Sequence, residues 1–132
     1  MRASKAFSLP KEERIRSRKL AEELFSGKGS RAMSAFPLRV VYKVVSQADA
    51  GIHTAMLASV SKRHFKQAVK RNRAKRQIRE AYRLRKHTLT DKMADKDGIL
   101  LLAFIWLSDE PHTSQEVSDS MKCLLDRIAE TL

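Results

Sequence analysis

Residues 66–86, KQAVKRNRAKRQIREAYRLRK, predict the element around which the rest of the fold is arranged. This run reads as one helix from about residue 65 to residue 86. At 100° per residue, four of its apolar side chains share one sector and predict a face that packs on a sheet. They are Ala74, Ile78, Ala81 and Tyr82.

The opposite side of the same helix is basic. Ten Lys and Arg residues accompany a single acid, Glu80. The residues expected on this side are Asn72, Lys75, Arg76, Arg79, Arg83 and Lys86, flanked by Lys70, Arg71 and Arg73. Solvated helix surfaces gain from opposite charges at i,i+4 and lose from like charges, so this face indicates a polyanionic partner. The whole-chain net charge of +12 points the same way, with nucleic acid ahead of an anionic membrane surface.

The flanking segments predict an α/β domain in the order helix, strand, strand, helix, strand, helix. Ser17 is a candidate N-cap for a helix that ends before Gly27. Residues 37–46 and 52–61 are rich in β-branched residues and are expected to form an antiparallel hairpin. A further short strand near residues 31–36 is possible, and residues 1–16 are expected to be extended or irregular.

The C-terminal third supplies a central strand and a closing helix. Residues 90–98 read as a connector, and residues 99–107 are apolar throughout, as in a strand covered on both faces. Thr113 and Glu116 have the spacing of a capping box. The apolar residues after them keep a helical period, and Cys123 among them is expected to be a buried or half-buried structural thiol.

Composition indicates one domain, residues 1–132, of a cytoplasmic protein. The length suits a single hydrophobic core, and one cysteine cannot form an internal disulfide. The N-terminal residues lack the apolar stretch of a secretory signal. The longest apolar run, residues 98–107, is about half of what a membrane-spanning helix needs.

The sequence SVSKRHFKQAVKRNRAKRQIREAYRL, residues 59–84, resembles the signature of the bacterial ribonuclease P protein family. The family pattern is SVSK followed by A-V-x-R-N-R-x-K-R-x-I-R-E-A-[FY]. Upstream, RIRSRKLAEELFSGKG and the strand LRVVYKVV are also similar to family segments, so the resemblance covers nearly the full chain.

This resemblance implies a small α/β sandwich with a left-handed β-α-β crossover and a role as the protein subunit of ribonuclease P. That ribonucleoprotein removes the 5′ leader from precursor tRNA. The resemblance implies that the RNA subunit carries the catalysis and holds the magnesium, with one protein expected per RNA. It implies no catalytic residue and no metal ligand in the protein itself.

The resemblance also assigns contacts residue by residue. Those expected to bind the RNA subunit are Lys70, Arg71, Asn72, Arg73, Lys75, Arg76, Arg79 and Arg83. Phe25 and Tyr42 match positions that line a cleft for the single-stranded leader, although either could be a plain core residue. Arg14, Arg16 and Lys62 are expected to add leader contacts.

Two departures from the family pattern concern geometry. Phe65 stands where other members have a glycine, in a segment that is one residue longer, which bears on how the basic helix begins. Ala21 occupies a position that is often aromatic, so the cleft is expected to have one stacking surface fewer.

No catalytic apparatus of the protein's own is recognisable. The four histidines are scattered, and Asp91, Asp95 and Asp97 read as a polar turn rather than a nuclease site. The main alternative is a non-catalytic RNA-binding module of ribosomal type. An autonomous nuclease and a peripheral membrane protein are weaker alternatives.

Overall fold

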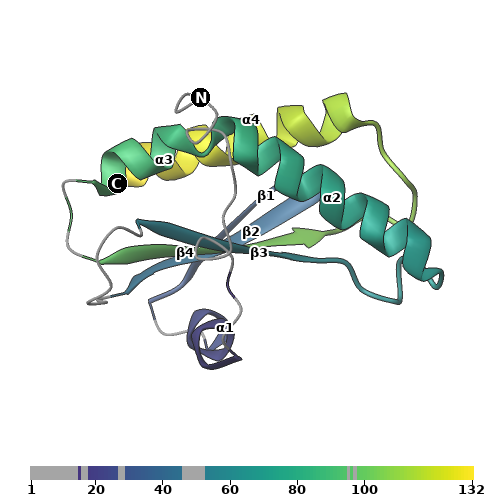
Figure 1. Ribbon diagram of the computed structural model, residues 1–132, viewed down its shortest axis with the longest axis horizontal. Coiled ribbons are helices and arrows are strands. Elements are labelled where there is room, and N and C mark those ends of the chain that lie inside the picture. Colours follow the sequence, from purple (N-terminus) through teal and green to yellow (C-terminus); the bar gives the residue numbers. More distant parts are fainter. Residues whose placement is uncertain (1–14, 16–17, 27–28, 46–52, 95, 97) are drawn as a thin grey trace, which may run out of the picture.

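A computed structural model describes residues 15, 18–26, 29–45, 53–94, 96 and 98–132, and these form a mixed α/β fold (Figure 1). Ser17 and Gly27, the expected caps of the first helix, lie outside the described residues. The elements in chain order are α1 (Arg18–Phe25), β1 (Arg31–Ala35), β2 (Leu38–Val45), β3 (Thr54–Ser59), α2 (Ala68–Arg85), α3 (His87–Met93), β4 (Ile99–Trp106) and α4 (Ser114–Thr131).

The four strands form one sheet in the order β1-β2-β4-β3. β2 pairs antiparallel with β1 and with β4, whereas β3 pairs parallel with β4. The predicted hairpin between β2 and β3 is therefore wrong, because β4 lies between them. The short strand considered near residues 31–36 is confirmed as β1. All residues of β4 are buried except Ile105, which is half-buried, as expected for a central strand. This apolar strand pairs with both β2 and β3 and so occupies the position between them.

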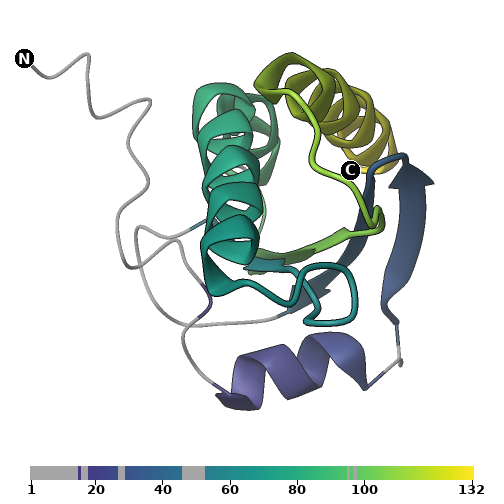
Figure 2. The ribbon, with the colours of Figure 1, turned by 90° about the vertical axis from the view of Figure 1, so that its right-hand side faces the viewer.

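The parallel strands β3 and β4 are joined through α2 and α3, which lie on one side of the sheet (Figure 1). Viewed from α2 with both strands pointing upward, β4 lies to the left of β3, so the crossover is left-handed, as the two perpendicular views show (Figures 1 and 2). Such connections are right-handed in about 98% of cases. The expected left-handed crossover is confirmed.

Helices cover both faces of the sheet (Figure 2). The larger core lies between the sheet and the helices α2, α3 and α4, and it includes Tyr82, Phe104 and Trp106. The smaller core on the other face joins Leu24 of α1 to Ala55, Leu101 and neighbouring residues. One side of α2 thus packs on the sheet, and the side that points away from the sheet is not covered by it.

The predicted apolar face of α2 is confirmed, because Ala74, Ile78, Ala81 and Tyr82 are the buried residues of this helix. The Tyr82 hydroxyl donates to Thr54 Oγ1 on β3 at 2.9 Å. This contact and the apolar packing fix the rotation of α2, and therefore decide which of its side chains face outward.

Four boundary and burial expectations are corrected. α2 begins at Ala68 rather than near residue 65, and α3 occupies the first part of the predicted connector. Cys123 is exposed, because it lies about 200° around α4 from Met121 and so leaves the apolar stripe. Lys86, expected on the basic side of the helix, is buried where α2 gives way to α3.

The capping box at the start of α4 is confirmed. Thr113 Oγ1 accepts from the Glu116 backbone N–H at 3.1 Å, and the Thr113 N–H donates to Glu116 Oε1 at 2.9 Å. This backbone hydrogen bond, with one from the Thr113 side chain, holds the pKa of Glu116 below its ordinary value of 4.5. The cap fixes the end of α4 that lies nearest to the first half of α2.

Thr113→Ala should lower the free energy of unfolding by about 1 kcal/mol, because it removes the cap of one helix N–H. Folding lowers the pKa of Glu116, so the ionised carboxylate stabilises the folded protein above pH 4.5. This contribution to the free energy of unfolding is lost as the pH falls through the lowered pKa. Urea unfolding measured at pH 7 and at pH 3 should give a larger difference in free energy of unfolding between wild type and variant at pH 7. An equal gap at both pH values would contradict the assigned role of Glu116.

Candidate RNA interface

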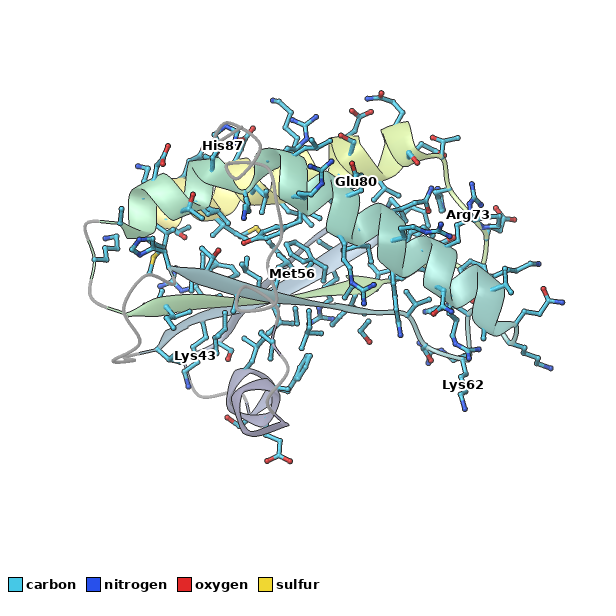
Figure 3. All side chains as sticks on the ribbon, viewed as in Figure 1. Lys43, Met56, Lys62, Arg73, Glu80 and His87 are labelled. Carbon is cyan, nitrogen blue, oxygen red and sulfur yellow. The ribbon has the colours of Figure 1, made fainter. Side chains whose placement is uncertain are left out.

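The outward side of α2 carries a continuous basic stripe, defined here as Lys70, Arg71, Asn72, Arg73, Lys75, Arg76, Arg79 and Arg83. Arg71, Lys75 and Arg83 are half-buried and the other members are exposed. Figure 3 labels Arg73 and Glu80 on α2 and shows many nitrogen-bearing side chains along this helix. The outward side of the helix carries Lys75, Arg76, Arg79 and Arg83 with Asn72, whereas Lys70, Arg71 and Arg73 flank that side near the helix N-terminus.

The stripe is electrostatically unfavourable in the protein by itself. The first turn of α2 contains no acid, and the N-cap residue Gln67 makes no side-chain capping bond. Lys70, Arg71 and Arg73 instead place positive charge near the helix N-terminus, where the helix dipole favours negative charge. A bound phosphate chain would relieve both this effect and the repulsion between the basic side chains.

One member of the stripe has an acidic partner on the helix. Arg83 Nε donates to Glu80 Oε2 at 3.2 Å, and its Nη2 pairs with Glu80 Oε1. The Arg83 hydrogen bond lowers the pKa of Glu80, and the same bond raises the pKa of Arg83. Glu80 therefore offsets part of the positive charge at the Arg83 end of the stripe.

Arg71 has a second role that the sequence did not reveal. Its Nη1 donates to the carbonyl oxygens of Phe65 and Lys66 at 2.9 and 2.8 Å. Because a guanidinium has five N–H donors, Arg71 can hold this loop and still present donors to a phosphate. The loop before α2 is therefore tied to the stripe itself.

Phe65, the departure from the family glycine, is buried where the chain turns into α2. Its ring lies 6.1 Å from that of Trp106, centroid to centroid, with an interplanar angle of 51°. The aromatic side chain thus fixes the start of the helix by packing, and the carbonyl bonds from Arg71 reinforce it.

The stripe ends at Arg83. Beyond it, Arg85 donates from Nη2 to Ser118 Oγ of α4 at 3.0 Å, and Lys86 is buried. At the middle of α2, Gln77 Nε2 donates to the His112 carbonyl, just before α4, at 2.9 Å. These bonds attach α2 to α4 and to the loop that precedes α4.

The two predicted leader-binding aromatics do not share a surface. Phe25 on α1 is 49% exposed, whereas Tyr42 is 4% exposed and lies in the larger core, on the opposite face of the sheet. The Tyr42 hydroxyl is 3.3 Å from Thr131 Oγ1 of α4. The expectation of one cleft lined by both rings is wrong for this structure, because strand alternation places Tyr42 with Leu38 and Val40 under α4.

The predicted basic leader contacts are only partly described. Lys62 is exposed in the loop before α2, below the helix start (Figure 3). Arg14 and Arg16 lie outside the described residues. The residue between them, Ile15, donates its backbone N–H to the Met56 carbonyl of β3 at 2.7 Å.

A protein-borne reaction centre is not apparent in the described part of the chain. Those residues include no group of three or more His, Cys, Asp or Glu side chains that could hold a metal ion. Asp91 is exposed on α3, and Asp95 and Asp97 lie outside the described residues. Among the described helices, none has the length and apolar character needed to cross a membrane.

Comparison with known proteins gives the family. The sequence model described as Ribonuclease P matches residues 9–129. A ribonuclease P protein component from Porphyromonas gingivalis is 42% identical over 129 residues, which cover 98% of this chain and 92% of the relative. The chain belongs to the ribonuclease P protein component family. A member from Chlorobaculum tepidum is 38% identical over 106 residues, covering 75% of this chain and 67% of the relative.

Solved structures of this family share the fold. The Staphylococcus aureus ribonuclease P protein matches with a TM-score of 0.64 at 20% identity, covering 88% of this chain and 94% of the other. The Thermotoga maritima protein matches with a TM-score of 0.63 at 19% identity, covering 87% and 96%. A role in a tRNA-processing endoribonuclease complex with an RNA partner follows from family membership.

Proposed function

We propose that this protein is the accessory subunit of ribonuclease P and binds the catalytic RNA through the basic stripe of α2. The RNA subunit performs the hydrolysis and holds the magnesium, and one protein binds one RNA in the cytoplasm. The protein assists endonucleolytic removal of the 5′ leader from precursor tRNA. It contributes positive charge and contacts to the single-stranded leader.

The observation that carries this proposal is the excess of positive charge on the stripe, where Glu80 is the single acid of α2. Its arginines are held on a rigid helix, and a guanidinium can contact two phosphate oxygens at once. Asn72 is exposed among them and offers both a donor and an acceptor, which suits a base edge or a ribose hydroxyl. A surface with both cations and an amide suits specific recognition of a structured RNA, whereas charge alone would attract any polyanion.

The leader contact that we propose uses Phe25 as the stacking ring, with Arg14, Arg16 and Lys62 as phosphate contacts. The half-exposed ring of Phe25 can accept any base, which suits leaders of variable sequence. Tyr42 is not part of this contact, because it lies in the larger core on the other face of the sheet, with its hydroxyl 3.3 Å from Thr131 Oγ1. Phe25→Ala should weaken precursor tRNA binding and leave binding of mature tRNA unchanged.

The decisive experiment is processing of a precursor tRNA by a bacterial ribonuclease P RNA at low magnesium. With this protein, cleavage at the mature 5′ end should occur at magnesium concentrations where the RNA alone is inactive. The reason is that the Lys and Arg side chains of the bound protein reduce repulsion between the catalytic RNA and the precursor tRNA. The protein without RNA should give no cleavage. Failure to stimulate, with tight binding to ribosomal RNA instead, would favour a ribosomal-type module.

A further inference from the structure

The loop before α2, residues 61–67, carries three exposed cations, Lys62, Arg63 and Lys66. From Ser61 to Arg79 the sequence contains no Asp or Glu. The loop therefore continues the positive charge of the stripe beyond the N-terminal end of α2. Neither Arg63 nor Lys66 belongs to the stripe or to the leader contacts proposed above.

Hydrogen bonds within this loop fix its turn. The backbone N–H groups of His64 and Phe65 donate to the Ser61 carbonyl at 3.0 and 3.4 Å. The Arg63 backbone N–H donates to Ser61 Oγ at 3.1 Å. These bonds determine the direction of the backbone at Arg63 and so limit where its side chain can lie.

Three contacts with other parts of the fold hold the loop in place. The buried Phe65 ring packs 6.1 Å from the Trp106 ring, centroid to centroid, and His64 Nδ1 lies 2.7 Å from Asp109 Oδ1 in the loop after β4. Arg71 Nη1 donates to the carbonyls of Phe65 and of the residue after it. A surface that is already ordered loses less conformational entropy when a partner binds.

Arg71 is the contact that links this loop directly to the stripe. It is half-buried near the start of α2, and its two bonds at 2.9 and 2.8 Å reach the carbonyls just before the N-cap residue Gln67. A planar guanidinium and the compact ammonium of a lysine are not equivalent at such a site. The position of Lys66 therefore depends on the guanidinium of Arg71.

We propose that this loop is a second, preformed contact with the RNA subunit, in which Arg63 and Lys66 bind phosphates and Arg71 positions them. The RNA subunit is the source of these phosphates because the same acid-free run continues into Lys70 of the stripe. The single-stranded leader is the competing source, since Lys62 of this loop is proposed to contact it. This inference rests on the proposed function and adds one contact to it.

Arg63→Ala with Lys66→Ala should weaken binding of ribonuclease P RNA roughly tenfold at moderate salt and flatten the plot of log affinity against log salt by roughly 0.7–0.9 per contact. Both side chains are exposed, so the melting temperature should stay at the wild-type value. Lys92→Ala with Arg127→Ala removes the same charge from exposed positions and is the control. An affinity equal to that of the control would refute the proposal. A loss seen only with precursor tRNA would overturn the assignment to the RNA subunit.

Arg71→Lys tests the positioning role, because it keeps the charge and removes the guanidinium. RNA affinity should fall roughly threefold to tenfold, and the same change should cost almost nothing in the Arg63→Ala, Lys66→Ala background, since Arg71 acts through these two side chains. The emission of Trp106, the single tryptophan, should shift because Phe65 packs against it. An equal loss in both backgrounds, or unchanged emission, would refute the positioning role.

The stripe separates failure of this inference from failure of the proposed function. If Arg76→Ala with Arg79→Ala weakens RNA binding but the loop double variant binds as the control does, subunit docking stands and the loop contact is refuted. If the wild-type protein does not bind ribonuclease P RNA at all, the proposed function is refuted, and the loop contact with it.

Discussion

Ile78→Asp should leave the protein unfolded at neutral pH. Ile78 is fully buried on the inner side of α2, in the larger core, and its neighbours there are hydrophobic side chains. An unpaired carboxylate there costs about 3–5 kcal/mol in addition to the lost apolar packing. That is a large part of a typical domain stability of about 5–15 kcal/mol. Circular dichroism and urea unfolding at pH 7 measure the effect.

Val69→Asp is the matched control for this substitution. Val69 lies on the same helix but is 78% exposed, so the same kind of change should alter the free energy of unfolding by less than about 0.5 kcal/mol. A cooperative unfolding transition of Ile78→Asp at the wild-type urea midpoint would mean that the rotation of α2 is wrong. The assignment of the stripe to the outer side would then fail with it.

The double substitution Arg76→Ala and Arg79→Ala should weaken binding of the RNA subunit roughly tenfold to a hundredfold at moderate salt. Both side chains are exposed at the middle of the stripe. Each lost phosphate contact should flatten the plot of log affinity against log salt by roughly 0.7–0.9. Filter binding across a salt series measures the affinity and the slope together.

Lys92→Ala with Arg127→Ala removes the same charge from exposed positions on α3 and α4, outside the stripe. This control should lower affinity only slightly, since distant exposed charges are screened by salt. Equal losses in both double variants would show that net charge, rather than the stripe, determines binding.

Local periodicity predicted α1, α2 and α4, because helix faces depend on neighbours three and four residues apart, but it missed the short α3. The buried face of α2 and the capping box of α4 are both local in this sense. The prediction that β2 pairs with β3 was wrong for the opposite reason. Strand order depends on contacts between distant segments, and the central place of β4 is not encoded in the turn between the two strands.

In the candidate site too, features set by helical spacing were predictable and features set by tertiary packing were not. The stripe followed from helical spacing, but the burial of Tyr42 and of Lys86 followed from which helix covers which part of the sheet. The bonds from Arg71 to two loop carbonyls depend on the shape of a loop that has no periodicity. The contact between the Phe65 and Trp106 rings was also missed, although the unexpected Phe65 was a signal of special packing before α2.

The central position of β4 has a consequence for the order of events during protein synthesis. Leaving the ribosome, β3 has no strand partner among the described elements until residues 99–106 have been made, some forty residues later. Until then, α2 emerges as a basic segment without the sheet that orients it. Assembly of the sheet therefore waits for a long-range contact, which slows folding, and the growing chain presents an ordered stripe only after β4 has been added.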